Sequence, residues 1–256
     1  MKHIDSTLIL EDYIYGKQTV EQLSIKYKIS KNTIRRKLNK VQVPLIISSQ
    51  KDVVVLMDTS YWGRNFGVCV LKDAYSGFVL WRKYIKHETL AIYQEGVDWL
   101  EDNGFYIEGI VCDGMRGIFK QFSRYRVQMC QFHQVAIIRR YLTNKPILKA
   151  SIELKSIVKT LTKTDKESFI GEFNEWCLRW DNFLKERHID SITGKSRYTH
   201  RRVRSACLSL KHNMPYLWTW YDNIDIGIPN TNNAIEGMFS DLKNKLRNHN
   251  GISKKT

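Results

Sequence analysis

Three acidic residues stand where carboxylates could hold metal ions. Asp58 follows the apolar run 53–57, which is typical of a strand buried on both faces, and Asp113 follows a predicted strand at 106–112. We expect both strands to end at their aspartate. In open sheets with helical crossovers, chemistry gathers at the carboxyl ends of the strands. Glu236, in the first turn of a predicted helix, is the candidate for the third carboxylate that two hard divalent ions need.

Each of these residues also has an ordinary structural explanation. An aspartate after a strand is most often a turn residue or a helix N-cap, and a glutamate in a first helical turn interacts favourably with the helix dipole. Asp73, in the predicted turn between the second and third strands, is assigned only that structural role. We assign metal binding and catalysis to Asp58, Asp113 and Glu236 because the strand order, the net charge and a predicted DNA-binding region agree.

The elements that must position the two aspartates predict an α/β fold. After the strand at 53–57 we expect strands at 66–71 and 78–85, a helix at 90–100, a strand at 106–112, a short helix at 118–122 and a strand at 126–130. Only short turns separate the first three strands, which therefore form an antiparallel meander. The later strands are separated by predicted helices, which is the arrangement of a helical crossover.

The first 42 residues predict a small helix-turn-helix domain. Thr19 and Gln22 form a capping box at the start of one short helix, and Ser30 is the N-cap of the next, at 31–40. The outer face of this second helix carries four residues that suit DNA recognition: Lys31, Asn32, Arg35 and Arg36. The alternative is a helical cap whose charges are only solvated. Residues 43–51 are expected to be a linker.

Residues 146–226 are predicted to be all helical, between a first part of the core at 52–145 and a last part at 227–256. Five aromatic residues recur at offsets of 4, 3, 4 and 3: Phe169, Phe173, Trp176, Trp180 and Phe183. This spacing favours a helix core over stacking on DNA bases. Trp218 and Trp220 are the better candidates for a DNA contact.

The charge balance points to a polyanionic partner. The 256 residues include 41 Lys and Arg against 26 Asp and Glu, a net charge of +15. We expect Lys243 and Arg247 to extend a phosphate track beyond Glu236. Five further bases are expected either on that track or on a solvated face: Lys195, Arg197, Arg201, Arg202 and Arg204.

The cellular setting is expected to be a reducing cytoplasm. The five cysteines are an odd number with irregular spacing, which indicates free thiols, and the start of the chain has no apolar secretory segment. No apolar run approaches the length of a membrane span.

Four short motifs, taken together, resemble the DDE transposases of bacterial insertion sequences, nearest to their Mutator-like branch, over roughly residues 50–250. They are Met57-Asp58-Thr59, Cys112-Asp113-Gly114, Cys130-Gln131-Phe132-His133 and Asn232-Asn233-Ala234-Ile235-Glu236-Gly237. The resemblance implies an RNase H-like core with a mixed five-stranded sheet, interrupted by an all-α insertion between the second and third acids. It implies that Asp58, Asp113 and Glu236 hold two Mg²⁺ ions, for which Mn²⁺ can substitute.

The same resemblance implies the partners and the location. The partners would be the terminal inverted repeats of the element and the target DNA, bound by a homo-oligomer, and neither a membrane nor a small-molecule substrate is expected. The protein would act at the nucleoid in the bacterial cytoplasm. The chain ends 20 residues after Glu236, where relatives often run further, so an inactive or truncated DNA-binding derivative is one alternative. A non-transposing RNase H-like nuclease is another.

Cys130 and His133 have three interpretations. Structural packing beside the active site is favoured over a contact between His133 and DNA phosphate. Half of a zinc site is the third interpretation, and it is disfavoured because no second Cys/His pair of suitable spacing follows.

Overall fold

The computed structural model describes residues 4–41, 51–192 and 194–247. These residues divide into two compact units, which are described separately. One is drawn from Met1–Ile47 and Ala234–Thr256, and the other from Ser48–Asn233. The predicted linker at 43–51 lies outside the described residues except for Lys51.

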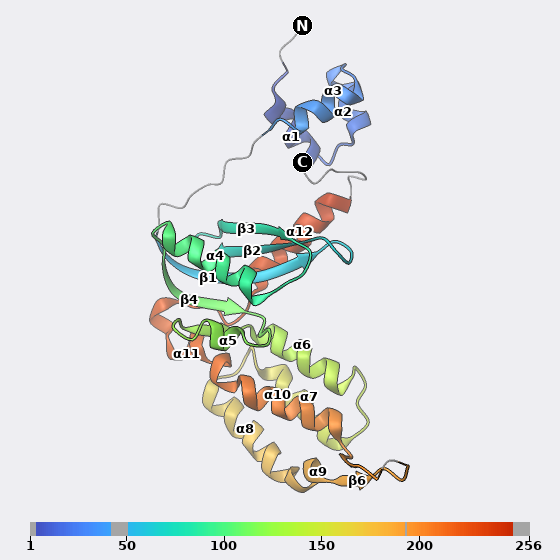
Figure 1. The fold of residues 1–256 in the computed structure, drawn as a ribbon, viewed down its shortest axis with the longest axis vertical. Helices are drawn as coiled ribbons and strands as arrows, with labels where there is room; N and C mark the ends of the chain where they lie inside the picture. Colours follow the sequence, from blue (N-terminus) through green and yellow to red (C-terminus); the bar gives the residue numbers. More distant parts are fainter. Residues whose placement is uncertain (1–3, 42–50, 193, 248–256) are drawn as a thin grey trace. The chain divides into compact units, whose positions relative to one another are not determined.

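The larger unit contains a five-stranded mixed sheet, so the predicted α/β class and mixed sheet are confirmed (Figure 1). Its strands are β1 (Asp52–Tyr61), β2 (Gly67–Asp73), β3 (Val79–Ile85), β4 (Tyr106–Cys112) and β5 (Val127–Met129), in the spatial order β3-β2-β1-β4-β5. The first three strands form the expected antiparallel meander, and β1, β4 and β5 are parallel. The crossovers contain α4 (Leu90–Asp102) and α5 (Ile118–Gln121).

The two faces of β1 pack into different apolar clusters because successive side chains of a strand point to opposite faces. Val53, Val55 and Met57 belong to the main core, together with residues of α4. Val54 and Leu56 belong to a smaller cluster that also contains Val111, Cys130 and Ile228. The strand is therefore buried on both sides, as its apolar run predicted.

Asp73 has the turn role that the sequence assigned to it. It is fully buried at the end of β2, and its carboxylate accepts hydrogen bonds from the backbone N–H groups of Tyr75 and Ser76 at 3.2 and 2.8 Å. The hydroxyl of Ser76 donates to the same carboxylate at 2.6 Å. These bonds hold the turn that leads into β3.

The chain between β5 and α12 is mostly helical and shares the main core. Its elements are α6 (Gln131–Leu142), α7 (Lys149–Thr160), α8 (Lys166–Arg179), α9 (Asp181–Lys185), α10 (Arg201–Leu217), α11 (Thr219–Asp222) and the 3₁₀ helix η1 (Ile224–Ile226). Phe169, Phe173 and Trp176 are buried, which confirms their assignment to a helix core. The single helix implied by the aromatic spacing is wrong, because the backbone leaves the helical conformation at Trp180.

Two further expectations for this region are wrong. It is not all helical, because β6 (Arg187–Ile189) and β7 (Ser196–Tyr198) form a two-stranded antiparallel sheet. These strands are short and polar, so no hydrophobic alternation marked them. Trp218 cannot be a DNA contact, since it is 1% exposed and its ring lies 5.7 Å from that of Phe169 in the core.

The smaller unit contains α1 (Ser6–Ile14), α2 (Val20–Tyr27), α3 (Lys31–Leu38) and α12 (Asn233–Arg247). The first three helices surround a core of Ile9, Tyr13, Leu23, Ile34 and Leu38. The capping box of Thr19 with Gln22 and the N-cap at Ser30 are confirmed. None of the helices among the described residues combines the length and the apolar character needed to cross a lipid bilayer.

The close approach of α4 to the sheet gives a stability prediction. A Cβ at Gly96 would lie 2.8 Å from Leu71 and 2.9 Å from Trp81, so Gly96→Ala should destabilise the protein by about 1–3 kcal/mol through overpacking. Gly171, on α8, has open space around it, and Gly171→Ala should stabilise by about 0.5–1 kcal/mol. Urea unfolding of both variants measures the difference, and equal effects would contradict the proposed tight contact.

Candidate active site

The register between β1 and β4 aligns the two predicted aspartates. Val54 pairs with Gly109 and Leu56 with Val111, a constant difference of 55 residues. Asp58 and Asp113 also differ by 55, so continuing the register for two residues beyond the last pair sets them opposite each other. Neighbouring strands lie about 4.8 Å apart, and opposed residues point to the same face. That face is the one that carries Val54, Leu56 and Val111.

A one-residue shift in the ladder creates this alignment. Asp52 and Val53 pair with Tyr106 and Ile107, a difference of 54, and the difference becomes 55 between Val53 and Val54. Glu108 is the extra residue on β4. Without it, the same ladder would bring Cys112 opposite Asp58 and turn Asp113 away, because a slip of one residue exchanges the two faces.

The expectation that β1 ends at Asp58 is wrong. The strand continues to Tyr61, and Asp58 pairs with Val70 of β2 in the antiparallel ladder. Pairing with β4, in contrast, stops at Leu56. Asp58 therefore lies where β1 is no longer paired with β4 but is still paired with β2. The second aspartate follows the end of β4 directly, as predicted.

Backbone hydrogen bonds orient both carboxylates. The N–H of Thr59 donates to Asp58 Oδ1 at 2.7 Å, and the N–H of Met115 donates to Asp113 Oδ1 at 2.9 Å. Gly114, which lies between Asp113 and Met115 in the chain, has φ +84°, a conformation that L side chains rarely adopt. A Cβ at Gly114 would lie 2.7 Å from Met129. Both aspartates are half-buried. Their positions are therefore set by the backbone.

The register of β4 with β5 adds Cys130 to Asp58 and Asp113, and these three residues are called the aligned row below. Ile110 pairs with Val127 and Cys112 with Met129, a difference of 17, which brings Cys130 opposite Asp113. The N–H of Cys130 donates to the carbonyl of Cys112 at 2.8 Å. Cys130 is buried and is the N-cap residue of α6, so His133 lies in the first turn of that helix. The Cys130 side chain packs in the smaller apolar cluster.

Asn230 and Asn232 connect the segment before α12 to β1 and to the start of α6 by hydrogen bonds. The side-chain N–H of Asn232 donates to the carbonyl of Met57 at 2.9 Å, and its backbone N–H donates to the Sγ of Cys130 at 3.2 Å. Asn230 exchanges two hydrogen bonds with Gln131, at 2.9 and 3.0 Å. The segment that leads into α12 is thus tied to β1 at Met57 and to the residues that directly follow β5. From the sequence alone, Asn232 was only part of a motif, and nothing distinguished Asn230.

Glu88 is an acidic residue of this region that the sequence analysis missed. It precedes α4, is half-buried, and accepts a hydrogen bond from the hydroxyl of Tyr93, which lies 3.1 Å from the hydroxyl of Thr59. Burial raises the pKa of the Glu88 carboxyl, and the charge of Asp113 raises it further, whereas the bond from Tyr93 lowers it. Nothing in the local sequence distinguished Glu88, because only the fold brings it within electrostatic range of Asp113.

The predicted residues of α3 and α12 lie in the smaller unit. Lys31, Asn32, Arg35 and Arg36 are all exposed on α3, where Lys31 pairs with Glu21 at 2.6 Å. Glu236, Lys243 and Arg247 lie on α12. Among these positions Glu236 and Lys243 are half-buried and Arg247 is exposed.

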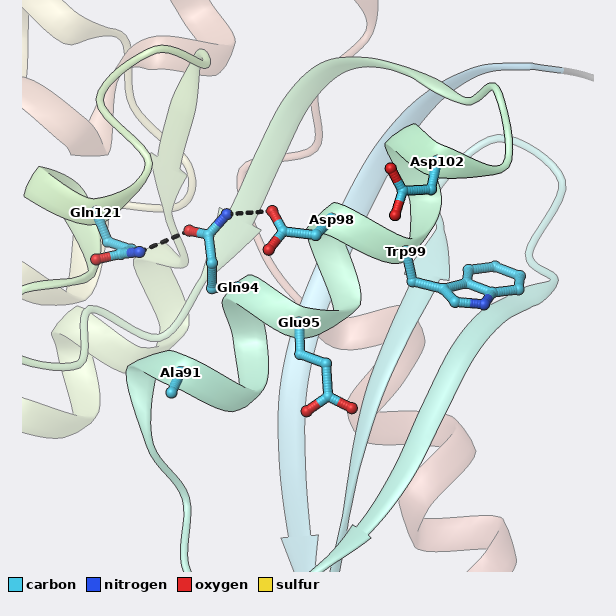
Figure 2. Close-up of a pocket in the computed structure, with 7 residues that line it drawn as sticks. All are labelled: Ala91, Gln94, Glu95, Asp98, Trp99, Asp102 and Gln121. Atoms are coloured by element: carbon cyan, nitrogen blue, oxygen red, sulfur yellow. Dashed lines mark hydrogen bonds between the residues drawn. The ribbon is translucent and has the colours of Figure 1, made fainter.

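A hollow on the outer face of α4 is chemically different from the aligned row. Figure 2 shows its lining residues: Ala91, Gln94, Glu95, Asp98, Trp99, Asp102 and Gln121. Gln121 donates to Gln94, which donates to Asp98, each at 2.6 Å. The hollow is acidic and would repel phosphate, so it is not the candidate site for a polyanionic partner. No residue of the row lines it.

No protein-family model matches the chain, and no curated protein matches it. The functional interpretation therefore depends on the geometry of the aligned row and on the motifs that contribute to it.

The hydrogen bonds of Asn232 give a second stability prediction. Asn232→Ala removes the donor to the buried Met57 carbonyl and should destabilise the protein by about 1–3 kcal/mol. The matched control is Asn182→Ala, an exposed residue of α9, which should change the free energy of unfolding by less than about 0.5 kcal/mol. A urea titration compares them, and an Asn232 variant as stable as the control would show that the fastening is unimportant.

Proposed function

We propose that this protein is the transposase of an insertion sequence. It would bind the DNA ends of its element, cleave a strand with the help of Mg²⁺, and join the freed 3′-hydroxyl to target DNA. The observation that carries this proposal is the parallel register of β1 with β4, which, continued two residues past its last pair, sets Asp58 opposite Asp113. The strand order and mixed sheet are compatible with an RNase H-like core, which is the fold that the motifs imply.

Glu236 is proposed as the third carboxylate. It follows Asn232 by four residues, and Asn232 is hydrogen-bonded to the carbonyl of Met57, the neighbour of Asp58. Support for Glu236 comes from the motif Asn232-Asn233-Ala234-Ile235-Glu236-Gly237, in which it matches the third acid of the transposases that the chain resembles.

The chemistry of the three side chains suits magnesium. Carboxylate oxygens are the hard ligands that Mg²⁺ prefers, and backbone hydrogen bonds already orient Asp58 and Asp113. Asp58 would hold both ions, while Asp113 and Glu236 would hold one each. When bound, Mg²⁺ ions neutralise charge on the scissile phosphate and lower the pKa of an attacking water.

The reaction needs two in-line displacements at phosphorus. In the first, water attacks the phosphate at the element end, the bond to the 3′ oxygen breaks, and a 3′-hydroxyl is freed. In the second, this hydroxyl attacks a target phosphate and displaces the target's own 3′ oxygen. The protein's part is to orient the reacting groups and to concentrate positive charge around them.

The helices of the smaller unit support a role in recognising DNA. A turn of three residues joins α2 to α3, as in a helix-turn-helix, and α3 exposes Lys31, Asn32, Arg35 and Arg36. The pair between Lys31 and Glu21 is exposed, so salt screens it and a DNA phosphate can displace it. The helices from α7 to α11 are proposed as the insertion of the core.

Substitution of the aligned aspartates tests the proposed activity. Asp58→Asn and Asp113→Asn should each reduce Mg²⁺-dependent strand cleavage by roughly 100-fold or more, because the lost charge is needed when the phosphate reacts. Duplexes from the DNA that flanks the gene supply the substrates, and a gel assay follows cleavage. DNA binding, measured on the same duplexes, should persist in both variants.

The matched control is Asp102→Asn, at the exposed end of α4, which should cleave at the wild-type rate. Cleavage should also stop when the metal is chelated and return with either Mg²⁺ or Mn²⁺. Full activity of the Asp58 variant would refute the assignment of the site.

A further inference from the structure

A hairpin in the helical region gathers positive charge that the proposed active site does not use. In the antiparallel pair β6–β7, Arg187 stands opposite Tyr198 and His188 opposite Arg197. Lys195 precedes β7, and Arg201 and Arg202 open α10. All the bases in this group are exposed: Arg187, His188, Lys195, Arg197, Arg201 and Arg202. Together with Tyr198, they are called the basic hairpin below.

Aromatic and hydrogen-bonding contacts hold the basic hairpin in one conformation. The guanidinium carbons of Arg187 and Arg204 lie 4.3 and 4.0 Å from the ring centroid of Tyr198, within the range of cation–π attraction. Arg187 Nε also donates to the hydroxyl of Ser196 at 2.8 Å. A ligand would therefore meet side chains that are already partly ordered, which lowers the entropy cost of binding.

Similar contacts hold the open end of the hairpin, where the chain enters β6 and leaves β7. His200 lies 2.8 Å from the carboxylate of Glu186, and its ring stacks on Phe183 with centroids 3.5 Å apart. The N–H of Thr199 donates to the carbonyl of Glu186 at 3.0 Å. These contacts pair the Glu186 carboxylate, which directly precedes β6, with His200.

Few carboxylates neutralise the bases. Asp190 is 3.9 Å from Arg197, a long ion pair, and no carboxylate of the described residues pairs with Arg187 or Arg201. A hollow lies among Arg187, Ser196, Arg197, Tyr198 and Arg201. Planar guanidinium groups with neighbouring hydroxyls are the donors that bind phosphate in a bidentate manner.

The tip of the hairpin adds an apolar element. Ile189 and Ile192 are 73% and 93% exposed on an otherwise polar segment. The major groove of DNA is wide enough to admit a two-stranded ribbon, and apolar side chains at such a tip can contact thymine methyl groups. Basic flanks with an apolar tip therefore match the phosphate rims and the floor of a groove.

On the basis of the proposed function, we infer that the basic hairpin is a second DNA-binding element, which holds backbone phosphates of duplex DNA independently of α3. Arg187, Arg197 and Arg201 contact the phosphates, and Ile189 and Ile192 lie in the groove between them. The phosphate contacts carry little sequence information and mainly position the duplex.

The salt dependence of DNA affinity tests the inference in the full chain. Each neutralised phosphate contributes a slope of about −0.9 to a plot of log K against log salt. The double variant Arg197→Gln/Arg201→Gln should therefore flatten the wild-type slope by about two units. Fluorescence anisotropy with a labelled duplex at several salt concentrations gives the slope. Circular dichroism checks that the double variant remains folded.

Two further variants separate the outcomes. Lys159→Gln/Lys163→Gln removes the same charge from exposed positions at the end of α7 and should leave the slope unchanged. Arg35→Gln/Arg36→Gln should weaken binding through α3. If this α3 variant weakens binding while the hairpin variant behaves like the lysine control, the inference is wrong and the proposed function stands.

Absence of binding by the wild-type chain to any duplex would overturn both the inference and the proposed function. An anionic lipid surface is the remaining partner for a basic segment with exposed isoleucines. Vesicles that contain phosphatidylserine provide this comparison. A hairpin variant that loses vesicle binding but keeps the wild-type DNA slope would also overturn the inference.

Discussion

The candidate site depends on one constraint, the parallel pairing of β1 with β4 after a one-residue shift. Alternating burial holds this register: Val55 and Met57 pack into the main core, while Val54 and Leu56 pack into the smaller cluster. A slip would exchange these two sets of side chains between faces that have different neighbours. The same slip would separate the aspartates that follow. Packing of the β1 residues before Asp58 thus sets the positions of the Asp58 and Asp113 carboxylates, which lie beyond the last pair between β1 and β4.

A second constraint joins parts of the chain that are far apart in sequence. Asn232 bonds to Met57 and to Cys130, across separations of 175 and 102 residues. A buried amide that has such partners is costly to remove, because the groups left behind lose their hydrogen bonds without gaining water. The segment before α12 is therefore held beside Met57 of β1 and beside Cys130, even though the whole helical region lies between β5 and this segment.

The net charge of +15 is distributed unevenly over the described surface. Bases are exposed on α3 and on the basic hairpin, while acids line the hollow on α4. Exposed charges act over about 10 Å at 0.1 M salt, so each surface acts on a ligand only at short range. A polyanion would be attracted to the first two and repelled by the third. The overall charge indicates only the class of partner, and the distribution indicates where that partner would be held.

The sequence by itself determined the elements whose signals are local. The apolar run before Asp58, the strand ending at Cys112, the capping box at Thr19 and the core aromatics Phe169 and Phe173 were all predicted and are present. The tertiary structure alone decided the alignment of Asp58 with Asp113, the burial of Trp218 and the position of Glu88 near Asp113. It also decided the polar hairpin β6–β7, which has no hydrophobic period. Local patterns report how a segment is buried, whereas strand register and long-range hydrogen bonds depend on partners that lie far away in the sequence.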